Sequence, residues 1–513
     1  MTARRFLLYA VTSFLECGCS VPAHQAPTST PQASDFEAII ARIERSDPES
    51  PAVLSAQLDY AEFLLSGAPG PCAERLERVQ EQLGSVDANP KTRVMFPDGW
   101  ARASNVEYHL HLARAACGSE TDRAIELRTA LAAAQRAVEL YRNAFDYRST
   151  VGMQADVASL FHQLGDNATA LAAVATTLDM DREYGFEDDA QENYKRSLSW
   201  RGEPAGDAQI AALMEDFPKR RAVLTFGWRP SDAQITLESH RECLDDSQIV
   251  VSRAAAILER RVAADSGGGW SVSYAHRLKR YDPGVWPTME SSQTPQMVFP
   301  PAALPAADFK VSATGEFAGV TDLTAFSARL ATKTEELIRA AAPSDGRARS
   351  LLRRAVDTTA TAFSPGMLEA ATAEDYQLET AMWIGATLEQ GVWYEISAPL
   401  SLPGSIPRVV VQHRIEFAFT RMVPCTVGTA APTCVEMIIH ATPDEDALDQ
   451  VIADSDLADY TASIEARIVT DAATLLPYAR EERLNWYVSL GNGKRDSVLE
   501  SEHLVSTTSY GAH

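Results

Sequence analysis

The spacing of hydrophobic residues changes near residue 220. From about residue 35 to residue 216, apolar residues recur three and four positions apart, which predicts amphipathic helices. "LSAQLDYAEFLLSG" and "PCAERLERVQEQLG" are two such segments, and residues 100–116 and 121–145 repeat the arrangement. Each neighbouring pair of segments is expected to form a helical hairpin, so residues 35–216 are predicted to be an all-α stack of hairpins.

Beyond residue 220 the apolar residues alternate with polar ones, which predicts half-buried strands. "RVVVQHRIEFAFTRMV" is the clearest case, because Val411, His413 and Ile415 share one face while Gln412, Arg414, Glu416 and Thr420 share the other, which is expected to face water. Helices are predicted within residues 324–388, at about 324–341, 345–361 and 365–388. The fold class is therefore multidomain, with an α+β domain at 220–513 in which a mainly antiparallel, curved sheet packs on helices.

One hairpin has a more specific pattern than the others. In "QADVASLFHQLGDNATALAAVATTLDMD", residues 154–181, small, aromatic and turn residues recur at fixed spacings, namely Ala158, Phe161, Leu164-Gly165-Asp166, Ala170 and Leu178. This segment resembles a tetratricopeptide (TPR) repeat, so the helical region is TPR-like. The resemblance implies a groove, lined by the first helix of each hairpin, that binds an extended peptide or another protein. The groove-facing positions would be Gly152, Ala155, Asp156, Ser159 and His162, of which Asp156, Ser159 and His162 are the candidate binding residues. A stack that acts only as a spacer or docking surface remains an alternative.

The first residues have the pattern of an export signal. Arg4 and Arg5 precede the mostly apolar segment 6–15, which has the length of a secretory signal and is too short to span a bilayer. The residues around Cys19 resemble the lipobox of bacterial lipoproteins, which implies that Cys19 is lipidated and, with Ser20 next to it, that the protein reaches the outer membrane. Glu16 departs from that pattern, so free secretion after cleavage at Ala23 remains an alternative. We expect a signal peptide at 1–19 and a flexible tether at 20–34.

Export changes how the other cysteines are interpreted, because nearby pairs are expected to form disulfides outside the cytoplasm. "CTVGTAAPTC" places Cys425 and Cys434 on either side of a turn between two predicted strands, so they are expected to be bridged. Cys72 begins one predicted helix and Cys117 ends a later one, so this pair is also expected to meet. Cys243 is then left over.

Charge and composition narrow the range of partners. The 513-residue chain has a net charge of −24 and 45% hydrophobic residues, which is enough for large cores but argues against nucleic acid as a partner. No later segment is apolar for long enough to predict a membrane span, so membrane contact is expected only through the N-terminal lipid. A protein or peptide partner is the expectation.

Motifs for common chemistry are absent from the sequence. There is no H-E-x-x-H, G-x-S-x-G or phosphate-binding loop, and no metal or cofactor is predicted. The acidic run "DMDREYGFEDDAQE" does not fit a calcium-binding loop and is expected to be a solvated helix end. We therefore predict a non-catalytic envelope lipoprotein that binds a protein, a peptide or an apolar ligand, with no catalytic residue. The alternative is a hydrolase-like envelope enzyme with a site around His413 or His440.

Overall fold

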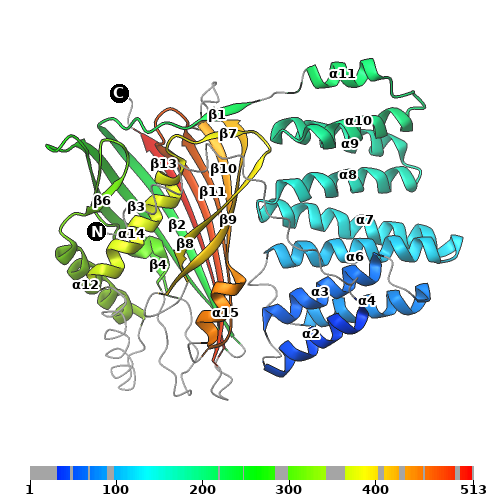
Figure 1. The fold of residues 1–513 in the computed structure, drawn as a ribbon, viewed down its shortest axis with the longest axis horizontal. Helices are drawn as coiled ribbons and strands as arrows, with labels where there is room; N and C mark the ends of the chain where they lie inside the picture. Colours follow the sequence, from blue (N-terminus) through cyan, green and yellow to red (C-terminus); the bar gives the residue numbers. More distant parts are fainter. Residues whose placement is uncertain are drawn as a thin grey trace.

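The structure is a computed structural model, and it describes residues 32–46, 50–66, 70–88, 97–215, 217, 220–245, 248–283, 299–341, 364–402, 409–426, 434–453, 457–490 and 497–510. Within these ranges the chain forms a stack of helices followed by a large antiparallel sheet with its own helices (Figure 1), which confirms the predicted fold class. The predicted signal peptide, Cys19 and most of the tether lie outside the described residues.

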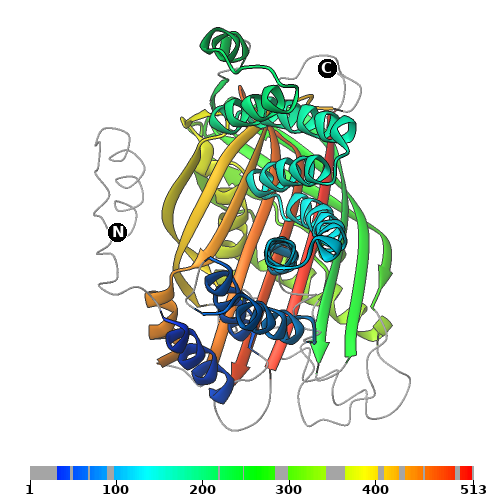
Figure 2. The same ribbon diagram turned by 90° about the vertical axis from the view of Figure 1, so that its right-hand side faces the viewer.

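Successive helices of the first part run back and forth as hairpins and stack along one side of the sheet domain (Figures 1 and 2). They are α2 (Ala33–Ser46), α3 (Pro51–Leu65), α4 (Cys72–Ala88), α6 (Pro97–Cys117), α7 (Glu120–Asn143), α8 (Tyr147–Gln163), α9 (Asn167–Tyr184), α10 (Glu187–Trp200) and α11 (Asp207–Glu215). Buried alanines of α7, such as Ala130 and Ala134, let its neighbours α6 and α8 approach closely. Asp146 and Asp166 begin α8 and α9, where each side chain accepts a backbone N–H of the first turn.

The second part contains an eleven-stranded sheet with strand order β6-β5-β4-β3-β2-β13-β12-β11-β10-β9-β8. Its strands are β2 (Ser231–Asp245), β3 (Gln248–Ala264), β4 (Trp270–Asp282), β5 (Phe309–Val311), β6 (Phe317–Val320), β8 (Trp393–Ser401), β9 (Val410–Val423), β10 (Cys434–Pro443), β11 (Leu457–Asp471), β12 (Pro477–Leu490) and β13 (Ser497–Tyr510). A separate two-stranded sheet joins β1 (Arg221–Val223) to β7 (Thr387–Glu389). The helices of this part are η1 (Pro301–Ala303), α12 (Leu323–Ala341), α14 (Pro365–Glu379), η2 (Ala381–Trp383) and α15 (Glu445–Ala453).

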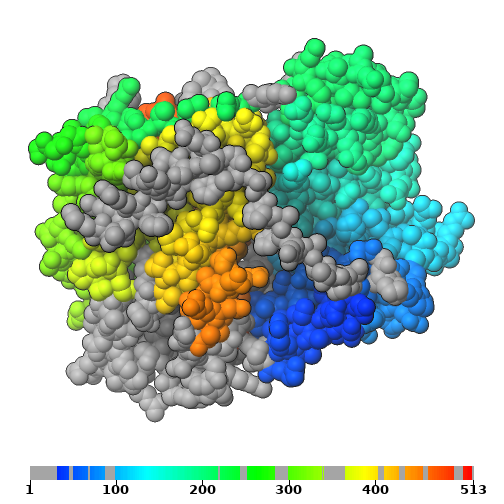
Figure 3. All heavy atoms as spheres, in the orientation of Figure 1, coloured from blue at the N-terminus to red at the C-terminus, as the bar shows by residue number. Residues whose placement is uncertain are grey.

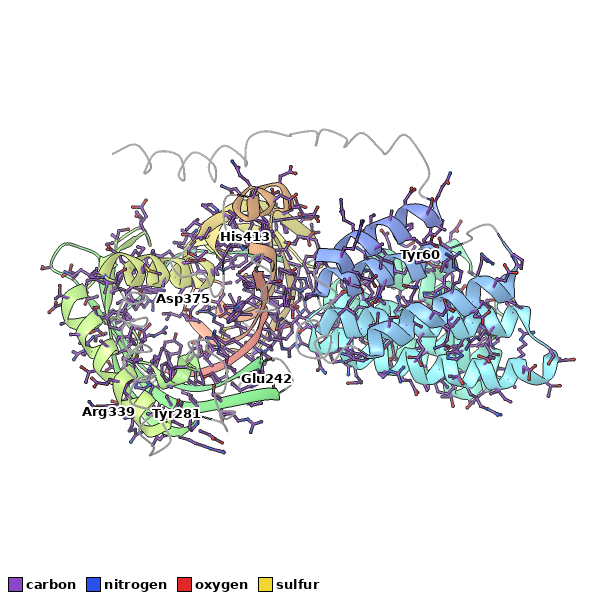
Figure 4. The ribbon with its side chains drawn as sticks, turned by 90° about the horizontal axis from the view of Figure 1, so that it is seen from below. Tyr60, Glu242, Tyr281, Arg339, Asp375 and His413 are labelled. Carbon is purple, nitrogen blue, oxygen red and sulfur yellow. A yellow bond between two sulfur atoms is a disulfide. The ribbon has the colours of Figure 1, made fainter. Side chains whose placement is uncertain are left out.

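The sheet is curved, and its two faces contact different partners (Figures 1 and 4). On the concave face, Leu378 and Trp383 pack against apolar side chains of β9, β10 and β11. On the convex face, Tyr147, Tyr184 and Phe186 of the helical stack pack against Ala418 and Ile438. The space-filling view shows the stack directly beside the sheet domain (Figure 3). The sheet is therefore covered by helices on both faces.

Two predictions about this part need correction. The helix predicted at 365–388 ends at Glu379, because the indole of Trp383 turns back to donate to the Leu378 carbonyl and Gly385 takes a left-handed conformation before β7. On β9 the predicted burial of Val411, His413 and Ile415 is confirmed, but Thr420 on the other face is also buried, because the helical stack covers that end of the strand. The helix predicted at 345–361 lies outside the described residues.

Both predicted disulfides are present. Cys72 at the start of α4 is bonded to Cys117 at the end of α6, and Cys425 is bonded to Cys434 across the β9–β10 connection. Cys243 lies on β2, but the described part of the structure does not include its side chain. Two disulfides are compatible with an exported protein or another oxidising environment. Among the described residues, no helix is long and apolar enough to cross a membrane.

Candidate functional site

The first helices of three successive hairpins, α6, α8 and α10, carry an interacting set of polar side chains. Asp156 of α8 interacts with Tyr108 and His109 of α6 and with Arg196 of α10. Burial raises the pKa of Asp156, opposed by the charges of His109 and Arg196 and by the hydrogen bond from Tyr108. Burial likewise lowers the pKa of His109. Asp156 is therefore held between the helices that flank it.

The other two predicted groove residues differ from each other. His162 stacks on Trp200 of α10, with ring centroids 4.6 Å apart, and its Nδ1 lies 2.7 Å from Oδ1 of Asn167. Ser159 donates its hydroxyl to the carbonyl of Ala155 within the same helix, at 2.9 Å. Asp156 and His162 thus both bridge from α8 to α10, whereas the Ser159 hydroxyl already has an acceptor.

A cleft of about 510 Å³ lies at the junction of the helical stack and the sheet domain. Its wall on the stack side comes from the starts of α8 and α10, and its wall on the sheet side from β1 and the β7–β8 turn; the lining residues are Arg148, Gly185, Phe186, Glu187, Asp188, Asp189, Phe217, Arg220, Arg221, Glu389, Gln390, Gly391 and Val392. A volume of this size at a domain boundary is typical of ligand-binding sites.

The cleft presents charges of both signs. Arg148 and Asp189 face each other across the starts of α8 and α10 at 3.7 Å, and Arg221 and Glu389 do so across β1 and β7 at 3.8 Å. Arg220 also lines the cleft, and its guanidinium forms no ion pair with any residue that the structure describes. Both ion pairs are long and largely exposed, so a ligand with charged groups could replace them at little cost.

A small hollow of about 10 Å³ adjoins the cleft, and four of its nine lining residues are aromatic. Arg148, Phe186 and Gly391 belong to both, and the hollow adds Tyr147, Tyr184, Trp393, Ala418, Thr420 and Ile438. Tyr147 and Tyr184 stack with ring centroids 4.5 Å apart. Charged groups and an apolar recess are therefore adjacent at this junction.

The acidic run at 179–192 is not simply a solvated helix end, as the sequence suggested. Asp181 is fully buried, where its Oδ2 accepts a hydrogen bond from Asn193 at 2.9 Å, and burial raises its pKa to about 7. Glu183 forms an ion pair with Arg421 of β9, and its backbone carbonyl accepts from Gln390. This run therefore connects the helical stack to the sheet, and only part of it, such as Asp179, faces water.

Under this connection the convex face of the sheet buries one carboxylate. Glu436 of β10 is fully buried and accepts hydrogen bonds from Arg421 at 3.0 Å, from Arg467 at 2.7 Å and from the Thr420 hydroxyl at 3.0 Å. Burial alone would raise its pKa, but the charges of Arg467 and Arg421 outweigh burial and hold the pKa below its usual value. Both carboxylate oxygens of Glu436 therefore accept hydrogen bonds, and we call the cluster of Glu436, Arg421, Arg467 and Thr420 the convex joint.

The concave face carries a second group of buried charges. Arg260 of β3 is 5% exposed and donates to the hydroxyl of Tyr510, and Arg480 of β12 forms ion pairs with Glu482 and, at 3.4 Å, with Asp375 of α14. Burial raises the pKa of Glu482, opposed by the charge of Arg480. The sequence interpretation missed both Arg260 and Glu436. Arg260 was detectable, because it shares the inward phase of β3 with Ala256, Leu258 and Val262.

The two histidines of the enzyme alternative do not share a site. His413 lies on the concave face, fully buried, with Nδ1 beside the Val411 carbonyl and with no partner for Nε2 among the described residues; burial lowers its pKa. His440 lies on the convex face, opposite Glu465 and Glu416 in the neighbouring strands. No group of three His, Cys, Asp or Glu side chains suited to a metal ion occurs in the part of the chain that the structure covers.

No protein-family model matches the chain, and no curated protein matches it significantly.

Proposed function

We propose that this protein is a non-catalytic, exported binding protein, in which the helical stack holds an extended segment of a partner protein. The segment would lie along the first helices α6, α8 and α10 and end in the cleft at the junction with the sheet. The proposal rests on the fact that the cleft and the polar set on the first helices are continuous. Arg148 and Asp189 line the cleft, and they lie in the first turns of α8 and α10, the helices that carry Asp156 and Arg196.

The lining predicts what kind of segment would bind. Charges of both signs favour a segment with at least one basic and one acidic side chain. Contacts at the exposed ion pairs would be screened by salt, so affinity should fall as ionic strength rises. The backbone of an extended segment would add hydrogen bonds that are independent of sequence.

Cellular location is part of the proposal. The N-terminal pattern supports export, and the two disulfides are compatible with it. Lipidation at Cys19, with an outer-membrane position, rests on the resemblance to a lipobox, and residues 20–34 would then serve as the tether. Mass spectrometry of the mature N-terminus tests it, because an unmodified chain that starts after Ala23 would rule out the anchor.

The binding proposal can be tested by selecting peptides from a random display library on the intact protein. A selected peptide would then be titrated against wild type and against Arg148→Gln and Asp189→Asn. We expect each substitution to weaken binding by about tenfold, the effect of losing one charge-assisted hydrogen bond.

The control for these two substitutions is an ion pair of the same length that does not line the cleft. Arg182 and Asp179 of α9 are also 3.7 Å apart, so Arg182→Gln and Asp179→Asn should leave affinity unchanged. The proposal is wrong if the selected peptides bind the cleft variants as tightly as wild type, or if a folded wild-type protein selects no peptide.

A further inference from the structure

Arg260 on the concave face is a buried charge that has no counter-ion at contact distance among the residues that the structure describes. It forms no ion pair with any described residue, and its Nε has no hydrogen-bond partner. Its other nitrogens bond to the phenols of Tyr510 and Tyr274, which are neutral groups. A buried charge is costly unless an opposite charge approaches it, so the site as described is electrostatically incomplete.

Two further N–H donors on this face also have no acceptor in the described part of the chain. They are Nε of Arg480, on β12, and the indole nitrogen of Trp228. Trp228 belongs to the apolar cluster that also contains Val262 and against which Tyr274 packs. Arg260, Arg480 and Trp228 thus present three N–H donors without an acceptor among the described residues. A ligand group with several acceptor oxygens would supply the missing acceptors.

The surroundings of Arg260 are apolar and aromatic. Rings follow one another from Tyr274 to Phe309 at 6.3 Å, from Phe309 to Tyr376 at 5.5 Å, and from Tyr376 to Trp228 at 5.9 Å. Seen from below, the strands and α14 surround a common interior, with Asp375 and Tyr281 on opposite sides of it (Figure 4). A ligand at Arg260 would therefore need an apolar body as well as an acceptor group.

We propose that the concave face of the sheet holds a binding site for a small amphiphile with a carboxylate head group. The carboxylate would accept hydrogen bonds from Nε of Arg260 and from the hydroxyl of Tyr274, and the apolar chain would lie along the aromatic rings. This site is separate from the groove and cleft of the helical stack, and it does not depend on the function proposed for them.

The neighbouring groups define the details of the site. Tyr274 is available as a donor because burial raises its pKa to about 12, whereas Tyr510 already donates to the Pro477 carbonyl at 2.9 Å. Glu379 of α14 acts on Arg260 through its charge, and the two do not form an ion pair. It would repel a carboxylate, so it limits affinity and does not take part in binding.

The test is a calorimetric titration of the full chain with palmitate and with hexadecanol, which share the alkyl chain and differ in the head group. We expect wild type to bind palmitate at least about tenfold more tightly than hexadecanol, because only the carboxylate forms charge-assisted hydrogen bonds with Arg260. Hexadecyl phosphate and acetate are added to distinguish a preference for any oxyanion, or for the head group alone. Binding of hexadecyl phosphate as tight as that of palmitate, or of acetate as tight as that of palmitate, would overturn the assignment of a carboxylate amphiphile.

Variants then locate the site. Arg260→Met should remove the preference for palmitate, and Glu379→Gln should tighten palmitate binding several-fold by removing a repulsive charge. Arg253→Met is the matched control, since Arg253 is exposed on the same strand, faces the opposite side and forms no ion pair with described residues. Equal affinity of wild type for palmitate and hexadecanol overturns the proposal even if Arg260→Met fails to fold, and so does an unchanged preference in a folded Arg260→Met.

Discussion

On the convex face of the sheet, the carboxylate of Glu436 is fully buried and accepts hydrogen bonds from two arginines and a threonine. On the concave face, the guanidinium of Arg260 is almost as deeply buried, and no carboxylate of the described residues contacts it. The first arrangement satisfies its central charge and links strands β9, β10 and β11. The second leaves Nε of Arg260 without a hydrogen-bond acceptor among the described residues. A buried charge can therefore either stabilise the fold or form part of a ligand-binding site. The two cases differ in whether its hydrogen-bonding groups have partners within the protein.

The convex joint also explains how the helical stack is fixed. Arg421 contacts Glu436 within the sheet and Glu183 on α9 of the stack, so the same guanidinium joins the two parts of the chain. Arg483 of β12 lies over the ring of Phe145 and adds a contact between charge and aromatic ring across the same junction. A change at Glu436 should therefore affect both the sheet and its contact with the stack.

The largest expected effect is that of Glu436→Gln. It would remove the buried carboxylate that Arg421 and Arg467 share and leave Arg421 with Glu183 as its remaining partner, which should lower the free energy of unfolding by about 3 kcal/mol in urea denaturation. Because the pKa of Glu436 is lower in the folded state than its usual value of 4.5, Glu436 contributes to stability at pH values above 4.5. This contribution is lost as the pH falls below 4.5 and through the folded-state pKa. A loss below about 1 kcal/mol at neutral pH would mean that the convex joint is not the stabilising element.

Asp181→Asn should act in the opposite direction, because one oxygen of this buried carboxylate has no partner among the described residues. Its folded-state pKa of about 7 exceeds the ordinary 3.8, so the folded chain binds more protons between these values and wild-type stability falls as pH rises through them. The variant should lack this fall and be about 1 to 3 kcal/mol more stable at pH 8. Thermal unfolding at pH 5 and pH 8 checks this, and equal shifts at both would contradict it.

Arg260→Met should also stabilise the ligand-free protein, by about 1 to 2 kcal/mol, because it replaces a buried charge that no described carboxylate contacts with an apolar chain of similar length. Urea denaturation in the absence of lipid measures the effect. A loss comparable to that of Glu436→Gln would instead show that Arg260 is a structural residue, and the contrast between the two faces would disappear.

Parts of this contrast could be predicted from the sequence, and others could not. Strict alternation predicted the inward face of β9, and the turn between Cys425 and Cys434 predicted their disulfide, because both depend on neighbouring residues. The pairing of β13 with β2, which aligns Tyr510 with Ala233, joins segments far apart in the chain, so no local pattern could supply it. The face on which Glu436 lies could not be predicted either. "CVEMIIHA" is buried at nearly every position, so its residues do not alternate between a buried and an exposed face.

The smallest expected effect comes from Arg414→Gln, and it tests whether partners or burial make the convex joint strong. Arg414 of β9 lies between two carboxylates, Glu395 and Glu416, each at 2.8 Å, so by partner count it matches the arrangement around Glu436. It is 56% exposed, however, and water competes for the same hydrogen bonds. The substitution should change the free energy of unfolding by less than about 0.5 kcal/mol, and less still in high salt. A loss near that of Glu436→Gln would show that the number of partners alone decides the strength, and burial would then no longer separate the two faces of the sheet.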